Sequence, residues 1–334
     1  MKNPYIIAEI GINHNGRIKD IKKLIYSAKK SGANAVKFQL FKAETLASKN
    51  SKLKSLYKKK KKETLYQMWK RLEISNSKLS LIKKITSKLK IDLIFSVFDN
   101  YSINRIKKFK SKFIKIASSD ITDLSLLKKI NSIKGAKIIL STGMSNKKEI
   151  SKALKCFKNK KIILLHCVSL YPCEIKKINL TRMVSLKKIF NTDVGFSDHT
   201  IGINACLLAL TMGAKIIEKH FTLSKKQDGP DHILSADEKD LKIICEFSQS
   251  INKMKGEGKI NPSNEELKVR RFARKGIYLK KNVQKGEKIK FDDLEIKRPL
   301  NKFDPSMIKK IIGKKASRKL VAGSSVKKDF FNYN

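Results

Sequence analysis

The most constraining feature of the sequence is an alternation of short apolar runs with longer, lysine-rich amphipathic stretches. Runs of strand length separated by helix-like patterns predict β/α units and a parallel sheet. Eight such runs occur within about 240 residues, at 5–12, 35–40, 92–98, 113–118, 137–142, 162–167, 194–197 and 215–221. A doubly wound open sheet is the alternative, but eight evenly spaced units favour closure into a (β/α)8, or TIM, barrel.

Polar side chains occupy the C-terminal half of nearly every one of these runs. A buried strand excludes such groups unless they converge on a ligand, because an unpaired buried charge is costly. The carboxyl ends of barrel strands meet at one mouth, where barrel enzymes have their active sites. We therefore expect a site there formed by Glu9, Lys37, Gln39, Ser96, Lys115, Ser118, Ser141, Thr142, His166, Ser197, Glu218 and His220.

Three of the five histidines lie between residues 194 and 232. His199 and His220 bracket an apolar helix-like segment and a strand, so the polar chemistry is confined to the loop ends. A buried divalent metal held by these two imidazoles explains the pattern. Asp198, beside His199, is expected to brace its loop.

The pattern changes after the eighth unit, which indicates a second domain. We assign 1–252 to the barrel, 253–273 to a polar linker containing Gly and Pro, and 274–334 to a small domain. A domain of roughly 60 residues is near the lower limit for independent folding. Packing against the barrel or against a second subunit is therefore expected.

The net charge of +47 raises the alternative of a nucleic-acid-binding protein on a barrel scaffold. However, only nine of the 76 basic residues are Arg, the residue on which phosphate and base recognition depends. The lysines are scattered along every amphipathic segment, with one dense run at Lys58–Lys62. Solvated lysine faces explain them better than a dedicated nucleic acid or membrane partner, and the positive field would attract an anionic substrate.

The expected location is the cytoplasm. No apolar run reaches the roughly 18 residues of a membrane span, and the N-terminal segment lacks the layout of a signal peptide. Five cysteines without a CxxC pair argue against a disulfide framework.

Ten sequence motifs carry a resemblance to a known family. AEIGINHNG, AVKFQ, IKIAS, ILSTGMS, LLHCVSLYP, GFSDHTIGI, EKHFTL and GPDH occur in the order found in the sialic acid synthase family. These bacterial enzymes make N-acetylneuraminate, legionaminate or pseudaminate. The C-terminal KRPL and GKKASRKLVAGSSV resemble the SAF domain of the same enzymes, which is similar to type III antifreeze protein.

The resemblance implies a transferase that condenses phosphoenolpyruvate with an open-chain N-acylated hexosamine. The C–O bond of phosphoenolpyruvate is cleaved, and the products are phosphate and a nine-carbon 2-keto sugar acid. N-acetylmannosamine is the first acceptor expected. The alternative acceptors are the 2,4-diacetamido-6-deoxy hexoses that lead to legionaminate and pseudaminate.

The resemblance also implies roles for individual residues. The phosphoenolpyruvate site would comprise Lys37, Lys115, Ser118, Ser141 and Ser197, and the sugar site Gln39, Ser169, Tyr171, Asp231 and Arg298. His199 and His220 match the metal-binding histidines, with Mn²⁺ usual and Mg²⁺ or Co²⁺ substituting. Glu9 would handle protons or orient the sugar. In a homodimer, the SAF domain would cover the partner's active site, and Arg298 would reach the sugar's N-acyl group.

Some assignments stay open at the level of the sequence. His166 fits a structural core residue, whereas His14 and His232 lie in loops that fit either a structural or a sugar-facing role. Ser169 stands where neuraminate synthases often carry Asn, which leaves recognition of the acyl group open. A further alternative is a catalytically silent relative that acts in a surface-polysaccharide assembly. The presence of all five expected site residues argues against it: Glu9, Lys37, Lys115, His199 and His220.

Overall fold

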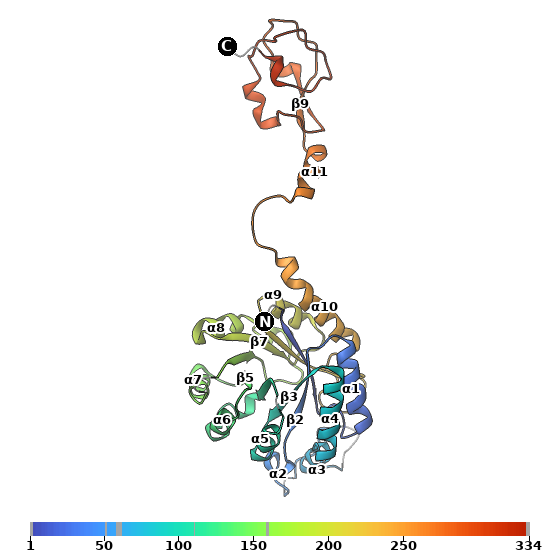
Figure 1. Cartoon of the computed structure of the whole chain (residues 1–334), viewed down its shortest axis with the longest axis vertical. Coiled ribbons are helices and arrows are strands. Elements are labelled where there is room, and N and C mark those ends of the chain that lie inside the picture. Colours follow the sequence, from blue (N-terminus) through green and yellow to red (C-terminus); the bar gives the residue numbers. More distant parts are fainter. Residues whose placement is uncertain (1–2, 51, 58–61, 110, 158–159, 332–334) are drawn as a thin grey trace. The chain divides into compact units, whose positions relative to one another are not determined.

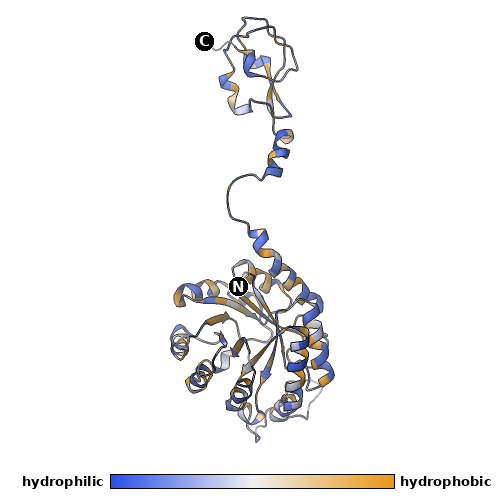
Figure 2. Cartoon of the chain, in the orientation of Figure 1, coloured by the Kyte–Doolittle hydropathy of each residue, from blue (hydrophilic) through white to orange (hydrophobic). Residues whose placement is uncertain are grey.

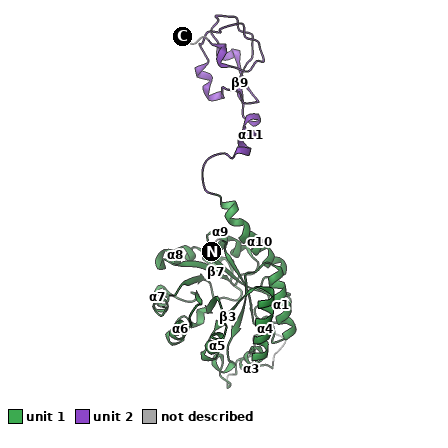
Figure 3. Ribbon diagram, viewed as in Figure 1, with its two compact units in different colours: residues 1–256 green, residues 257–334 purple. Residues whose placement is uncertain are grey.

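The structure is a computed structural model that describes residues 3–50, 52–57, 62–109, 111–157 and 160–331. It divides into two compact units, Met1–Gly256 and Glu257–Asn334 (Figure 3). Most of the lysine run predicted to be solvated, Lys58–Lys61, lies outside the described residues. Among the described helices, none combines the length and the apolar character needed to cross a membrane.

Eight parallel strands form a closed barrel in the first unit, which confirms the predicted fold (Figure 1). Neighbours in sequence are neighbours in the barrel, and β1 closes the ring by pairing with both β2 and β8. The strands are β1 (Tyr5–Gly11), β2 (Ala35–Leu40), β3 (Asp92–Val97), β4 (Phe113–Ile116), β5 (Lys137–Ser141), β6 (Ile162–His166), β7 (Asp193–Asp198) and β8 (Ile216–His220).

Helices surround the strands, and each buries its apolar stripe against them. In α1, for example, Ile21, Leu24, Ile25 and Ala28 are buried at helical spacing. Figure 2 shows hydrophilic residues along the helices of this ring, as scattered lysines require. The helices that follow β1 and β3–β8 are α1 (Ile18–Lys30), α5 (Asn100–Ile106), α6 (Leu124–Asn131), α7 (Lys147–Lys155), α8 (Thr181–Phe190), α9 (Asn204–Thr211) and α10 (Glu238–Lys255).

The core has two layers that leave one end of the barrel polar. Between strands and helices lies the larger cluster, which includes Ile217 and Phe221 of the β8 region. A smaller cluster fills the inside of the barrel and includes Ile7, Ile94 and Ile216. Because side chains alternate along a strand, Glu218 and His220 follow Ile216 on the inner face toward the carboxyl end. Inward positions at that end therefore hold the polar residues.

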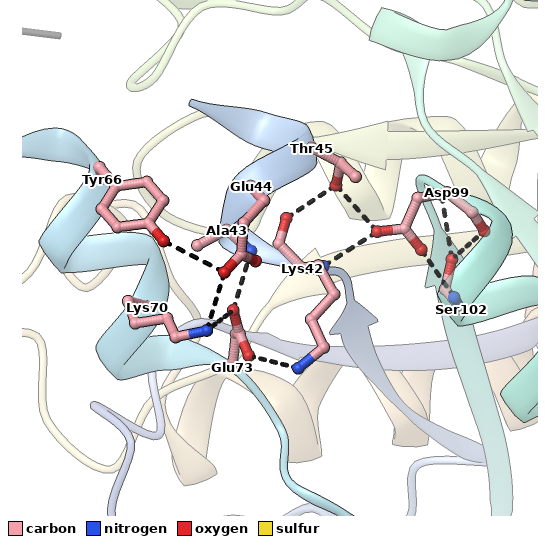
Figure 4. Close-up of polar contacts among 9 residues, drawn as sticks. All are labelled: Lys42, Ala43, Glu44, Thr45, Tyr66, Lys70, Glu73, Asp99 and Ser102. Atoms are coloured by element: carbon pink, nitrogen blue, oxygen red, sulfur yellow. Dashed lines mark hydrogen bonds and ion pairs between the residues drawn. The ribbon is translucent and has the colours of Figure 1, made fainter. Parts of the chain in front are cut away.

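The β2–β3 connection is longer than the others and contains α2 (Ala43–Leu46), α3 (Leu65–Leu72) and α4 (Asn76–Leu89). Two carboxylates fix its start (Figure 4). Glu73 accepts from the Ala43 backbone N–H and from Lys42 Nζ, both at 2.9 Å. Asp99 accepts from the Lys42 backbone N–H at 2.9 Å and caps α5 through the Ser102 N–H at 2.6 Å. The carboxyl ends of β2 and β3 are thereby held together.

The second unit contains an antiparallel pair, β9 (Gly276–Leu279) and β10 (Leu294–Lys297), over its own apolar core. The segment 253–273 was predicted as a linker from its polar composition. In the structure, α10 continues to Lys255 and α11 occupies Asn264–Ala273. Ser263 caps α11 by accepting from the Glu266 N–H, an arrangement that makes a short polar helix favourable. The predicted linker segment therefore contains helix at both of its ends, and the division between the two units falls within it.

Candidate active site

A cavity of about 320 Å³ opens at the carboxyl ends of the strands. Eleven of the thirteen residues assigned to substrates, catalysis or metal line it: Glu9, Lys37, Gln39, Lys115, Ser118, Ser141, Ser169, Tyr171, Ser197, His199 and His220. Asp231 lies just behind His220, with 3.6 Å between its Oδ2 and the imidazole Nδ1. Arg298 belongs to the second unit, where it is exposed.

Two buried ammonium groups lie in the cavity wall, each bonded to a hydroxyl of the next strand. Lys37 Nζ donates to Ser96 Oγ at 2.8 Å, and Lys115 Nζ donates to Ser141 Oγ at 2.7 Å. Both lysines are about 3% exposed, so each charge requires compensation within the protein. Each of these ammonium groups lines the cavity and is placed to donate a hydrogen bond to an anionic ligand.

Two carboxylates supply that compensation. Glu9 Oε2 lies 2.9 Å from Lys37 Nζ, and Glu218 Oε1 lies 3.7 Å from both Lys37 Nζ and Lys115 Nζ. Ser197 Oγ donates to the same Glu218 oxygen at 3.0 Å. Glu218 is thus the bridge between the two ammonium groups.

The two carboxyl groups differ in proton affinity. Burial raises the pKa of Glu9, and the nearby Glu218 charge adds to this effect, while Lys37 only partly opposes it. For Glu218, burial is outweighed by Lys115 and Lys37, so its pKa falls below the ordinary value. Glu9 therefore takes up a proton more readily than Glu218 does, so it is the candidate proton donor of the site.

Closely packed polar side chains surround Gly143 near Lys115. The Gly143 N–H donates to Ser118 Oγ at 3.0 Å, and Ser118 Oγ lies 3.1 Å from Cys167 Sγ. A Cβ atom at Gly143 would fall 2.4 Å from Ser169 Oγ and 2.8 Å from both Cys167 Sγ and Ser118 Oγ. The backbone must approach these groups too closely for any side chain, which explains the glycine.

The two candidate metal-binding histidines lie together, with ring centroids 5.7 Å apart. His199 Nδ1 is 2.8 Å from the Val168 carbonyl oxygen. Because a carbonyl can only accept a hydrogen bond, Nδ1 carries the ring proton, and Nε2 has a free lone pair. His220 Nδ1 is buried and has no hydrogen-bond partner among the described residues. Burial lowers the pKa of both rings, so both are neutral, as a metal requires.

These features fit a divalent metal with two protein ligands. Within the described part of the chain, no group of three or more His, Cys, Asp or Glu side chains is arranged to hold an ion. The remaining coordination positions would then belong to oxygens of substrate and water, a set that suits Mn²⁺ or Mg²⁺ better than structural zinc. Tyr171, with its ring centroid 4.1 Å from that of His199, limits access to this side of the cavity.

The three histidines left open by the sequence lie outside the cavity lining. His14 Nδ1 accepts from the Gly16 N–H at 3.0 Å and so holds the turn after β1. His166 bonds the Ile178 carbonyl at 2.6 Å, and its ring stacks on another ring of the outer core. His232 bonds Thr222 Oγ1 at 2.7 Å. Each of these contacts is structural.

Buried His14 makes the fold acid-sensitive. Burial lowers its pKa from 6.5 to about 3, so at pH 5 the unfolded chain binds a proton that the folded chain does not. Stability therefore falls as the pH drops from 6.5 toward 3, by about 2 kcal/mol at pH 5 for this group. We expect His14→Asn to reduce the stability difference between pH 7 and pH 5 by that amount in urea unfolding. If His14→Asn left the stability difference between pH 7 and pH 5 unchanged, His14 would not be the source of the acid sensitivity.

Glu218 and Ser96 are site residues that received no role from the sequence. Both had been recognised as polar strand residues, but motif positions gave them no function. The signal for Glu218 was its place two residues before His220 on the same face of β8. Its bridging of Lys37 and Lys115 depends on barrel closure, which no local pattern encodes.

Comparison with known proteins decides the family. Residues 24–260 match the NeuB family, and residues 274–332 match the SAF domain. The chain belongs to the NeuB family. The predicted resemblance is thereby confirmed, and the relatives' names support a synthase.

Two curated relatives and one solved structure illustrate this membership. The N,N'-diacetyllegionaminic acid synthase of Legionella pneumophila is 38% identical over 96% of this chain and 93% of its own length. A pseudaminic acid synthase of Campylobacter jejuni is 32% identical over 99% and 97%. The crystal structure of N-acetylneuraminic acid synthetase from Leptospira borgpetersenii, in complex with citrate, has a TM-score of 0.71 and 34% identity over 80% of this chain and 92% of that one.

Proposed function

We propose that this NeuB-family chain condenses phosphoenolpyruvate with an open-chain N-acylated amino sugar, giving a nine-carbon 2-keto sugar acid and phosphate. The observation that carries the proposal is the cavity itself, where two buried ammonium groups, six serine hydroxyls and two neutral imidazoles line one space. The cations suit the phosphate and carboxylate of phosphoenolpyruvate. The imidazoles suit a metal at the sugar aldehyde.

The chain's own residues have separate tasks in this reaction. Lys37 and Lys115 neutralise the phosphoenolpyruvate charges and orient C3 toward the aldehyde carbon, with Ser118, Ser141 and Ser197 completing the hydrogen bonds. C3 forms the new C–C bond, water adds to C2, and the C–O bond to phosphate breaks. Glu9, the carboxyl group that takes up a proton more readily, exchanges a proton with the sugar. When bound by His199 and His220, Mn²⁺ supplies Lewis acidity toward developing negative charge at the aldehyde.

The acceptor is assigned by similarity, with Gln39, Ser169, Tyr171 and Asp231 as its proposed contacts. Because a relative that makes N,N'-diacetyllegionaminic acid is 38% identical to this chain, a 2,4-diacetamido-6-deoxy hexose is the first acceptor to test. N-acetylmannosamine, which the sequence had placed first, is the second. Burial and then the nearby Glu9 charge raise the pKa of Asp231 to about 7, so this carboxyl both donates and accepts near neutral pH.

Phosphate release from phosphoenolpyruvate tests the proposal. The purified chain is incubated with each candidate sugar, including the pseudaminate precursor, first with Mn²⁺ and then with EDTA. We expect turnover with one sugar, and its loss in EDTA. An absence of turnover with all three sugars in Mn²⁺ would refute the reaction, and turnover unaffected by EDTA would refute the metal.

Arg298 tests the further proposal of a homodimer in which the SAF domain covers the partner's active site. It follows β10 and is exposed, so its guanidinium is available to a ligand. We expect Arg298→Ala to raise the sugar KM strongly, because the N-acyl contact is lost, with little change in the KM for phosphoenolpyruvate. Steady-state kinetics with each substrate varied in turn measures both. An equal loss for the two substrates would contradict this role.

A further inference from the structure

A buried ion pair lies on the outer face of the barrel, behind the two candidate metal-binding histidines. Lys219 Nζ is 2.7 Å from Asp198 Oδ2, and the two side chains are 1% and 0% exposed. The residues are register partners at the ends of β8 and β7. Neither lines the cavity, because the inward positions on these strands belong to Ser197 and Glu218. The proposed reaction therefore leaves this pair without a role.

The pair holds the backbone on both sides of His199. Lys219 Nζ also donates to the Thr200 carbonyl at 2.5 Å, and Asp198 Oδ1 accepts from the Thr200 N–H at 2.9 Å. Asp198 and Thr200 are the sequence neighbours of His199, and Lys219 directly precedes His220. One ammonium group therefore connects the turn that presents the first imidazole to the strand that presents the second.

Stability alone does not account for these charges. Removing two charges from water carries a penalty that their attraction offsets only partly, and well-packed apolar replacements of buried pairs are often equally stable. An apolar pair at Asp198 and Lys219 would suit the surrounding outer core, where Phe196 and Ile217 are the preceding register partners. What an apolar pair would lack is the directional bonding that fixes the His199 turn.

We propose that Asp198 and Lys219 are positioning residues that set the placement of His199 relative to His220, and with it the affinity of the site for a divalent cation. The inference rests on the proposed function, which assigns both imidazoles to that cation. It also explains why a lysine occupies an outward position of β8 that otherwise belongs to the apolar layer, between Ile217 and Phe221.

The test uses the double variant Asp198→Asn/Lys219→Met in the full-length chain. Both replacements preserve side-chain size and remove both charges, so no unpaired charge is left in the core. Mn²⁺ binding is titrated by electron paramagnetic resonance without substrates, and phosphoenolpyruvate binding by calorimetry. We expect the Mn²⁺ Kd to rise about 10- to 100-fold, as for other residues that orient a ligand, while phosphoenolpyruvate affinity stays unchanged.

Asp99→Asn is the matched control. Asp99 is a buried carboxylate that caps α5 just after β3 and fixes the backbone there, remote in sequence from both histidines (Figure 4). The Asp99→Asn variant should have a lower Tm than the wild-type chain and the same Mn²⁺ Kd. Asp198→Glu, which keeps both charges paired but displaces the carboxylate from the Thr200 N–H, is the second variant should the double variant not fold. Its Mn²⁺ Kd should also rise, by a smaller factor.

The outcomes separate the inference from the proposed function. Wild-type Mn²⁺ affinity in the folded double variant, or in Asp198→Glu if only that variant folds, would overturn the positioning role alone. An equal weakening in Asp99→Asn would overturn it as well, because general destabilisation would then explain the effect. If the wild-type chain binds no Mn²⁺, the metal assignment in the proposed function fails, and this inference fails with it.

Discussion

Replacing His220 with alanine is expected to abolish Mn²⁺ binding and to lower kcat by at least about 10³-fold. The proposed site has only two protein ligands, so the loss of one leaves a single imidazole. Lewis-acid stabilisation of several kcal/mol corresponds to a rate factor of that size. Phosphate release with the accepted sugar and Mn²⁺ titration of the free protein measure the two effects.

His166→Gln is the control for that prediction. His166 also ends a strand, but its Nε2 bonds the Ile178 carbonyl and its ring stacks on Phe196, away from the cavity. The amide of glutamine can donate to the same carbonyl. We expect a lower Tm with unchanged Mn²⁺ affinity and kcat. Retention of Mn²⁺ binding in His220→Ala would contradict the metal assignment.

The fold was predictable because its signal is local and repeated. Apolar runs such as 35–40 and 137–142 are bounded by amphipathic helices with capping residues, and eight repeats leave few topologies. The β2–β3 connection was less predictable. Its short helices α2 and α3 are fixed by contacts such as Glu73 with Lys42, which join residues 31 positions apart. The helix α11 was missed because a strongly polar segment lacks the apolar stripe on which helix prediction depends.

The residues of the site were predictable from where they lie on their strands, but their pairing was not. That Lys37 and Lys115 lie within strands follows from the apolar pattern. That Glu218 lies between them follows only from the closed ring, which brings β2, β4 and β8 around one space. The different proton affinities of Glu9 and Glu218 depend on the same closure, because burial acts to raise the pKa of both carboxyl groups and only for Glu218 do Lys115 and Lys37 together outweigh it.

Substituting Lys115 with methionine is expected to raise the KM for phosphoenolpyruvate about 10- to 100-fold, which is the range for a lost hydrogen bond to a charged group. Burial, and then the charge of Lys37, lower the pKa of Lys115. An incoming anion would counter both effects, so this lysine should gain more from the ligand than a surface lysine does. Steady-state kinetics at saturating sugar gives the KM, and Mn²⁺ titration should give the wild-type Kd.

Lys115→Met tests phosphoenolpyruvate binding more directly than Lys37→Met, because it leaves no buried carboxylate without a partner. Without Lys115, Glu218 keeps Lys37 at 3.7 Å and the Ser197 hydroxyl at 3.0 Å. Without Lys37, Glu9 would lose its 2.9 Å partner and remain a buried acid, at a cost of about 3–5 kcal/mol in folding stability if ionised. Lys112→Met, just before the same strand in an exposed pair with Asp92, is the control. If it raised the KM equally, the effect would reflect the overall positive field rather than a direct contact.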